Sequence, residues 1–152
     1  MNKKKLFLQL LIVIGVLQFF QIDKENPPVE QPKDFIAMTN PPIEVANILK
    51  TSCYDCHSHE SKYPWYTNVS PLSWWIKHHI NDARKHLNFS TWAEYDAKKQ
   101  DHKLDECIEE VKEGEMPLNS YLWAHSESKL TSEQKETLLA FFESKRTHIS
   151  DK

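Results

Sequence analysis

The spacing of apolar residues divides this chain into three parts. Residues 6–22 form a nearly unbroken apolar run, residues 23–40 have few apolar positions, and residues 41–148 place apolar residues at helical intervals. The pattern predicts an N-terminal helix, an extended linker and a helical domain, in that order along the chain.

The N-terminal part, residues 1–22, has the layout of a membrane anchor. Lys3, Lys4 and Lys5 precede the apolar run. As a helix of 17 residues the run would be roughly 26 Å long, slightly short of a bilayer core of about 30 Å. The leading lysines predict a cytoplasmic N-terminus and a single pass through the cytoplasmic membrane, with the domain facing the periplasm or cell exterior. A cleaved secretory signal has the same layout, but no small-residue cleavage site follows the run, which favours an uncleaved anchor.

The linker is predicted to be an extended tether over residues 23–40. Pro27, Pro28 and Pro32 lie among charged residues, without apolar periodicity. Such a segment is semi-rigid, so we expect it to hold the domain off the bilayer.

Residues 41–148 are predicted to form an all-α domain, because they contain helix signals and no convincing strand. The first expected helix runs from the cap Asn40 into Cys53, and the second from the cap Ser70 to Asn88. A short third helix is expected around Trp92, after a cap at Ser90 or Thr91. The fourth is expected over residues 101–113, before Gly114, and the last begins at the capping box of Thr131. The expected buried face of the second of these helices consists of Leu72, Trp75, Ile76, Ile80, Ala83 and Leu87.

Composition narrows the function further. The chain has 19 basic and 22 acidic residues and a net charge of −3. Nucleic-acid binding calls for clustered Lys and Arg, so we expect no nucleic-acid partner. The three cysteines are too few for a disulfide framework, and the core must come from packing.

A five-residue motif carries the strongest chemical signal. Cys53-Tyr54-Asp55-Cys56-His57 has the C-x-x-C-H spacing by which a chain attaches a c-type haem covalently. One turn of backbone presents both thiols to one porphyrin edge, and the adjacent histidine becomes the proximal ligand of the iron. We therefore expect haem c, bound through Cys53 and Cys56, with His57 as axial ligand.

Two other uses of a C-x-x-C pair are a thiol redox couple and half of a zinc site. The first usually accompanies a βαβ pattern and the second needs another ligand pair at comparable spacing. Neither is visible, and Cys107 stands alone, 51 positions beyond Cys56. We expect Cys107 to be a small core residue.

The sixth position of the iron decides between electron carrier, sensor and catalyst. Met116 is the leading candidate, because it lies in an irregular stretch before Pro117 and its thioether would raise the reduction potential. His79 and His86 are the alternative distal ligands, since helical spacing puts both on the apolar face of the second domain helix. We expect the many tryptophans and tyrosines mostly to wall the haem pocket and the core.

Several segments together resemble the bacterial haem-binding domain family that is related to cytochrome c. They are Ser52-Cys53-Tyr54-Asp55-Cys56-His57-Ser58, Tyr63-Pro64-Trp65-Tyr66, Trp74-Trp75, the segment from His86 to Trp92, and Gly114-Glu115-Met116-Pro117-Leu118. The resemblance covers about residues 35–148 and implies a cytochrome c-like helical fold, covalent haem with His57 proximal and Met116 distal, and electron transfer. The long Trp-rich insert before Trp92 departs from compact cytochromes c.

These features predict a membrane-tethered monohaem cytochrome that passes single electrons to a redox partner protein and is not an enzyme. The outer-sphere mechanism keeps both iron ligands in place. The alternatives are a peroxidase-like haem, with His79 or His86 assisting proton transfer, and a haem-based sensor or accessory domain.

Overall fold

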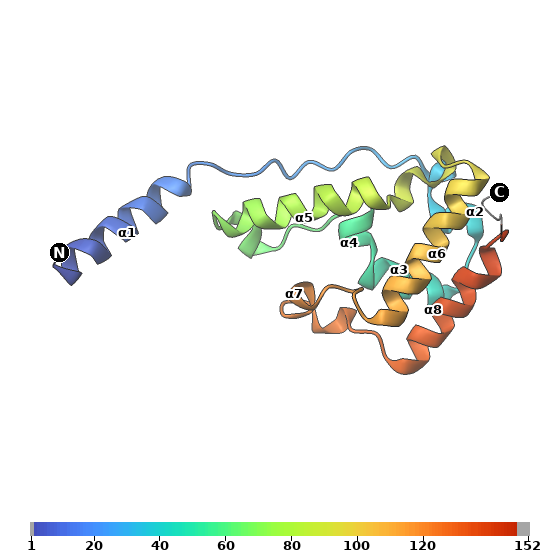
Figure 1. Cartoon of the computed structure of the whole chain (residues 1–152). Coiled ribbons are helices and arrows are strands. Elements are labelled where there is room, and N and C mark those ends of the chain that lie inside the picture. Colours follow the sequence, from blue (N-terminus) through green and yellow to red (C-terminus); the bar gives the residue numbers. More distant parts are fainter. Residues whose placement is uncertain (1, 149–152) are drawn as a thin grey trace.

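The computed structural model describes residues 2–148, and all regular structure in that range is helical (Figure 1). The prediction of an all-α fold is confirmed for these residues. The α-helices are α1 (Lys3–Leu17), α2 (Phe35–Thr39), α3 (Ile43–Ser52), α4 (Tyr54–His57), α5 (Leu72–His86), α6 (Ala97–Glu113), α7 (Asn119–Leu122) and α8 (Ser132–Lys145). Four short 3-10 helices separate them: η1 (Gln31–Lys33), η2 (Trp65–Asn68), η3 (Phe89–Glu94) and η4 (Ser126–Ser128).

The N-terminal helix is shorter than its apolar run. The helix was expected to continue to Ile22, but α1 ends at Leu17. Gln18 turns the chain because its side-chain amide donates both to the carbonyl of Ile14 and to that of Ser70, each at 2.8 Å. Between residues 2 and 148, no helix has both the length and the apolar content needed to cross a bilayer.

The segment after α1 is not a free spacer. It runs alongside α5 for most of its length (Figure 1). The carbonyl of Phe20 accepts from the Ser70 hydroxyl at 2.9 Å and from the Trp74 indole at 2.7 Å, and the Asn26 side chain accepts from Arg84 at 2.8 Å. These bonds hold the segment against the domain, whereas its composition predicts an extended tether that holds the domain off the bilayer.

The last residues of the expected tether belong to the core. Phe35 is fully buried, with its ring centroid 5.1 Å from that of Phe89 and 4.7 Å from that of Trp92. Asp34 caps α2 and accepts a hydrogen bond from the Tyr54 hydroxyl at 3.0 Å. The packed part of the chain therefore begins before residue 41, where the domain was expected to start.

Three helix caps differ from expectation for the same reason. Asn40 was expected to begin α3, but it ends α2 in the left-handed conformation, with φ of 44°, and α3 begins at Ile43. Ser70 does not cap α5, because its hydroxyl bonds Phe20 instead. Asn88, rather than Ser90, caps η3. In each case another element uses the residue: the Ser70 hydroxyl donates to the Phe20 carbonyl, the Ser90 hydroxyl accepts from the His59 N–H, and Asn40 ends α2 through its own backbone.

The C-terminal helices follow their local signals. Gly114 ends α6 with φ of +81°, a conformation that glycine adopts without steric cost. The capping box of α8 is formed, with the Thr131 hydroxyl accepting from the Gln134 N–H at 3.1 Å and the Gln134 amide oxygen accepting from the Thr131 N–H at 3.0 Å. Both predictions are confirmed.

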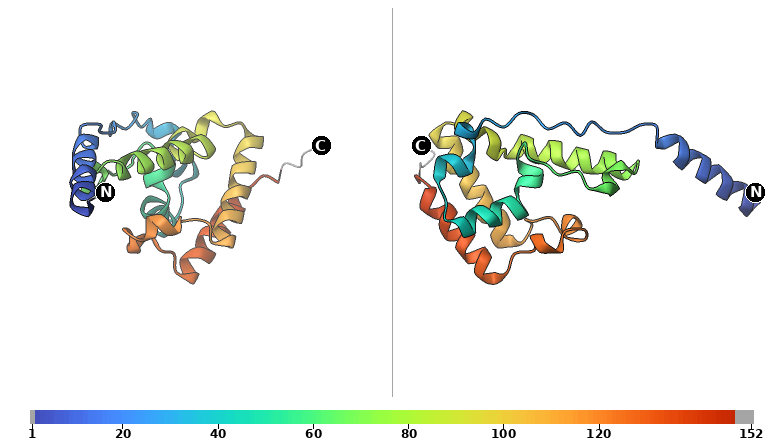
Figure 2. Two further views of the ribbon diagram at one scale, coloured as in Figure 1. Left: turned by 60° about the vertical axis from the view of Figure 1, so that its left-hand side comes forward. Right: turned by 180° about the vertical axis from the view of Figure 1, so that it is seen from behind.

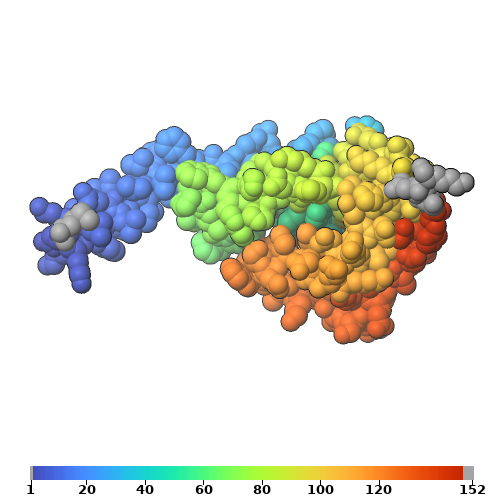
Figure 3. Space-filling view, in the orientation of Figure 1, coloured from blue at the N-terminus to red at the C-terminus, as the bar shows by residue number. Residues whose placement is uncertain are grey.

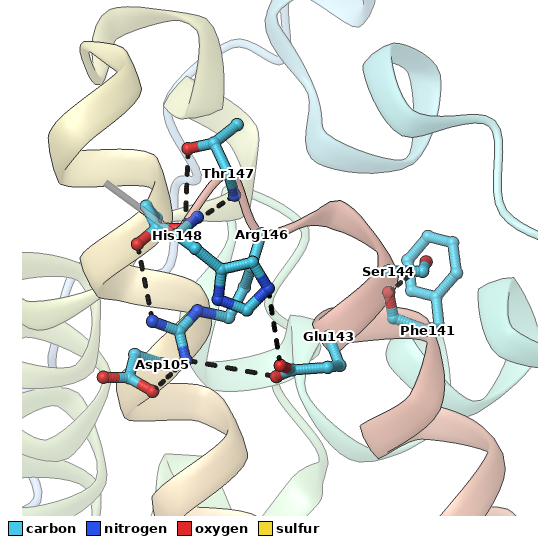
Figure 4. Close-up of polar contacts among 8 residues, drawn as sticks. Asp105, Phe141, Glu143, Ser144, Arg146, Thr147 and His148 are labelled. Atoms are coloured by element: carbon cyan, nitrogen blue, oxygen red, sulfur yellow. Dashed lines mark hydrogen bonds and ion pairs between the residues drawn. The ribbon is translucent and has the colours of Figure 1, made fainter. Parts of the chain in front are cut away.

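α6 and α8 pack on each other, and a polar cluster fastens their far ends (Figure 4). The buried carboxylate of Asp101 on α6 accepts from the backbone N–H groups of Thr147, at 2.7 Å, and His148, at 2.9 Å. Arg146 bonds both Asp101 and Asp105. Burial alone would raise the pKa of Asp101, but these hydrogen bonds hold it below its ordinary value.

The beginning of α5 does not bury the face that its pattern predicts. Ile80 and Leu87 are buried, whereas Leu72 and Trp75 are 42% and 47% exposed. Trp92 is buried, and the other tryptophans, Trp65, Trp74, Trp75 and Trp123, are exposed. The expectation that the aromatic residues mostly wall the pocket and the core is therefore wrong for the tryptophans.

Phe35→Ala tests whether residues 34–39 belong to the folded core. The substitution leaves a cavity among aromatic rings, so we expect the free energy of unfolding to fall by about 3–5 kcal/mol in urea denaturation. Ile43→Ala removes an exposed apolar side chain and should change it by no more than about 0.5 kcal/mol. Equal, small effects of the two substitutions would show that residues 34–39 are a tether after all.

Candidate haem-binding site

One cavity of about 510 Å³ lies between α5 and the layer formed by α6, α7 and α8. In Figure 3 the surface is hollowed between α5, in green, and the α6–α7 region, in orange. Apolar side chains form much of its wall, including Leu87, Phe89, Val111, Leu138 and Phe142. The volume lies within the range of roughly 300–1,000 Å³ for cofactor pockets. Figure 2 shows the surrounding helices from two further sides.

The C-x-x-C-H motif is a tight turn at the end of α3. The Cys53 N–H donates to the carbonyl of Leu49 at 3.0 Å, which completes α3. The Cys53 carbonyl then accepts from the N–H groups of Cys56, at 3.2 Å, and His57, at 2.9 Å. This geometry brings Cys53, Cys56 and His57 together at the wall of the same cavity.

The two residues between the cysteines hold the turn in place. The Tyr54 ring is buried and stacks on Phe89, with 5.2 Å between centroids. The Asp55 carboxylate accepts from the Tyr121 hydroxyl of α7 at 2.7 Å and from the Lys62 N–H at 3.2 Å. Both residues anchor the turn to the surrounding protein, and this sets the positions of the two thiols and the imidazole.

His57 is held as a neutral imidazole. Its Nδ1 lies 3.2 Å from the carbonyl oxygen of Leu87, and because a carbonyl only accepts, Nδ1 carries the proton. Burial lowers the pKa of His57, against the effect of hydrogen bonds to Leu87 and Ala83. A histidine fixed through Nδ1–H presents an unprotonated Nε2, which is the arrangement found in metal-ligating histidines.

The two motif thiols are free and unreactive in this environment. Burial raises the pKa of Cys53 to about 12 and that of Cys56 to about 11, with smaller contributions from Cys56 and Asp55 respectively. A thiol redox couple needs a lowered pKa, because the thiolate is the nucleophile. The surroundings of the pair are therefore unlike those of a redox dithiol.

All three candidates for the sixth ligand line the cavity. Met116 lies in the loop after α6, where its backbone N–H donates to the carbonyl of Glu110 at 3.2 Å. The Nδ1–H of His79 donates to the carbonyl of Trp75 at 2.9 Å, because a carbonyl oxygen only accepts. His86 lies in the last turn of α5 and is exposed. Met116 and the two histidines thus reach the cavity from different elements.

Several contacts around the site could not be predicted from the sequence. Arg84 supports the motif from α5, donating to the Ser58 carbonyl at 2.7 Å and to the Ser61 hydroxyl at 2.9 Å. Lys103 lines the cavity beside Glu106, with 2.5 Å between the charged atoms. Cys107, expected to be a core residue, packs against the core and also lines the cavity. These contacts join segments far apart in the sequence, so spacing could not reveal them.

The donor set suits an iron porphyrin. Two thiols, one Nδ1-fixed imidazole and one thioether meet at an apolar cavity of suitable volume. Within residues 2–148, no group of three or more His, Cys, Asp or Glu side chains is placed to hold a metal ion by itself.

The fold and the site together define a helical haem-binding domain. The chain matches the family model described as a haem-binding domain over residues 12–144, and it belongs to that family. Haem is therefore its cofactor. No curated protein and no solved structure matches the chain.

Alkylation of the haem-free chain tests the environment of the thiols. With pKa values near 11 and 12, the thiolate fraction of Cys56 and Cys53 at pH 8 is roughly a hundredfold or more below that of an ordinary cysteine. We expect iodoacetamide to modify them correspondingly slowly, with a rate that keeps rising above pH 10. The same chain in urea is the control. Equal rates at pH 8 with and without urea would contradict the buried arrangement.

Proposed function

We propose that the chain holds one haem c covalently and uses it for one-electron transfer outside the cytoplasmic membrane. The observation that carries the proposal is that one cavity brings together Cys53, Cys56, His57 and Met116. The first three residues come from one turn and the fourth from a loop about sixty positions later in the sequence.

Covalent attachment follows from the chemistry of the two thiols. Each thiol would add its sulfur to one carbon of a haem vinyl group and its hydrogen to the other, so the thioether would need no oxidant. The raised pKa values of Cys53 and Cys56 mean that the haem-free chain holds these thiols protonated. This keeps them from oxidising before attachment, because the thiolate is the reactive species.

His57 and Met116 would be the residues that hold the iron, His57 through its imidazole and Met116 through its thioether. His57 projects from α4 and Met116 from the loop after α6, so they approach the cavity from separate elements. The Leu87 carbonyl orients the imidazole through Nδ1–H, which also makes Nε2 more basic. The apolar wall excludes water and lowers the local dielectric.

When bound, the haem supplies a one-electron iron couple. The chain keeps both ligands in place in the two oxidation states, and a thioether ligand raises the potential by favouring ferrous iron. The partner is a redox protein that approaches the cavity, whose lining includes Asp82, Glu106, Glu109 and Glu110. Lys85 pairs with Asp82 and Lys103 pairs with Glu106, which leaves Glu109 and Glu110 as the acidic groups without a lysine partner among the described ion pairs. These groups suit a partner with a basic docking surface.

Membrane attachment through α1 completes the proposal. The large apolar residues of α1 between Leu6 and Val16 are 42–62% exposed, and the helix buries none of its residues. α1 has 15 residues and is therefore about 22 Å long, shorter than a bilayer core of about 30 Å, so the crossing that we propose needs local thinning of the bilayer. Lys3, Lys4 and Lys5 lie at the end that we propose stays on the cytoplasmic side, as the positive-inside rule favours. The domain is then on the periplasmic or external side.

A peroxidase-like or sensor function is the alternative, and the presence of His79 and His86 at the cavity favours it. Either histidine could assist proton transfer at an open distal face. A histidine could also be the sixth ligand in place of Met116. The two functions differ in whether a ligand leaves the iron during the reaction.

Met116→Ala separates these possibilities. For the electron carrier we expect the variant to lose the low-spin thioether absorption and to fall in reduction potential on the order of 0.1 V, within the range of about 0.8 V that axial ligands span. Spectroelectrochemistry of the haem-loaded full chain measures both quantities.

His79→Ala and His86→Ala are the matched controls and should leave the thioether band and the potential in place. If Met116→Ala changes neither property and a histidine variant changes both, the distal assignment to Met116 is wrong. Rapid turnover of peroxide by the unmodified chain would favour the enzyme.

A further inference from the structure

A group of exposed apolar side chains lies where η2 meets the beginning of α5. We call it the aromatic edge, and it consists of Trp65, Val69, Leu72, Trp74 and Trp75. Their exposed fractions run from 38% to 78%. Scattered single apolar residues are normal on a protein surface, but three exposed tryptophans within eleven positions on two adjoining elements are an unusual concentration that calls for an occupant.

The aromatic edge is hydrogen-bonded to the end of α1. The Gln18 side chain donates to the Ser70 carbonyl at 2.8 Å and accepts from the Ser70 N–H at 3.0 Å. The indole N–H of Trp74 donates to the carbonyl of Phe20 at 2.7 Å. Lys24 also bonds the side chain of Asn68, at the end of η2. The edge is therefore continuous with the apolar helix and cannot swing away from it without breaking these bonds.

The beginning of α5 lies close to α1 in all three ribbon views. In Figures 1 and 2 the beginning of α5 is the part of the domain nearest to α1, and α5 points away from it. Phe19 and Phe20, which join the two, are 87% and 61% exposed. One apolar surface thus runs from α1 through these phenylalanines onto the domain.

We propose that the aromatic edge rests in the lipid headgroup region of the same membrane that holds α1. This inference extends the membrane attachment proposed above to the domain itself. Tryptophan favours the membrane–water interface because its large ring is apolar while its N–H needs a polar partner. Residues 63–77 contain no Asp or Glu, so no carboxylate of the aromatic edge itself has to be desolvated at the interface.

This contact gives the domain a fixed orientation. His79, which lines the cavity, comes four residues after Trp75, and the centroids of their rings are 4.2 Å apart, so the cavity begins directly beside the aromatic edge. His86, at the other end of α5, lies farther still. The cavity is thereby held close to the membrane but outside it, and a soluble partner can reach the open side.

Photolabelling of the haem-loaded full chain in phosphatidylcholine vesicles tests the contact. The vesicles carry a phospholipid with a photoactivatable diazirine near its headgroup. Trypsin releases the aromatic edge as peptide 63–77, the apolar helix as peptide 6–24, and a remote region with exposed Met38 and Ile43 as peptide 34–50. We expect about ten times more label in 63–77 than in 34–50, because a group held at the interface meets lipid continuously.

Trp65→Gln with Leu72→Gln should lower the label in peptide 63–77 at least about fivefold without changing that in 6–24, because the interface no longer favours this edge. Ile43→Gln is the matched control, since Ile43 and Leu72 are both exposed apolar residues at the first position of a helix. It should leave all three peptides unchanged. An unaltered haem absorption spectrum verifies that each variant keeps its fold.

The outcomes separate this inference from the membrane attachment on which it rests. Label in 6–24 with only background label in 63–77 overturns the contact of the aromatic edge and leaves the anchor standing. Background label in both peptides overturns the anchor and the contact together. Equal label in 63–77 and 34–50 means random collision and also overturns the inference.

Discussion

The hydrogen bond from His57 Nδ1 to the carbonyl of Leu87 is the contact on which the site depends. It joins α4 to the end of α5, and the cavity opens between α5 and the packed pair of α6 and α8. Because the bond leaves Nε2 unprotonated, it suits His57 to the role of iron ligand that we propose for it. Arg84 strengthens the same junction by donating to the carbonyl of Ser58, immediately after the motif.

The parts of the fold that sequence could predict are those set by neighbouring residues. Gly114 ends α6 because it readily adopts the left-handed conformation that this helix end requires. Thr131 and Gln134 form a capping box whose hydrogen bonds lie within four residues. The backbone of the C-x-x-C-H turn belongs to the same class, since the Cys53 carbonyl accepts from the N–H groups of Cys56 and His57 within one turn. Such features need no knowledge of the tertiary structure.

The predictions that proved wrong concern residues that another segment of the chain uses. Asn40 and Ser70 are good caps in isolation, but one ends the preceding helix and the other bonds the chain after α1. Phe35 lies in a proline-rich, charged stretch, and only the rings of Phe89 and Trp92 make it a core residue. The helical periodicity of α5 likewise predicts an apolar face, but it does not distinguish a face covered by protein from one covered by lipid.

The central claim is that haem is attached to the two thiols of one turn. Tandem mass spectrometry of the tryptic peptide 51–62, from chain produced with haem-attachment machinery, tests this most directly, because that peptide contains Cys53 and Cys56 but not Cys107. The account predicts a single peptide heavier by one haem, with fragments placing the added mass on both cysteines. Two free thiols on that peptide in chain that has nevertheless bound haem would contradict it.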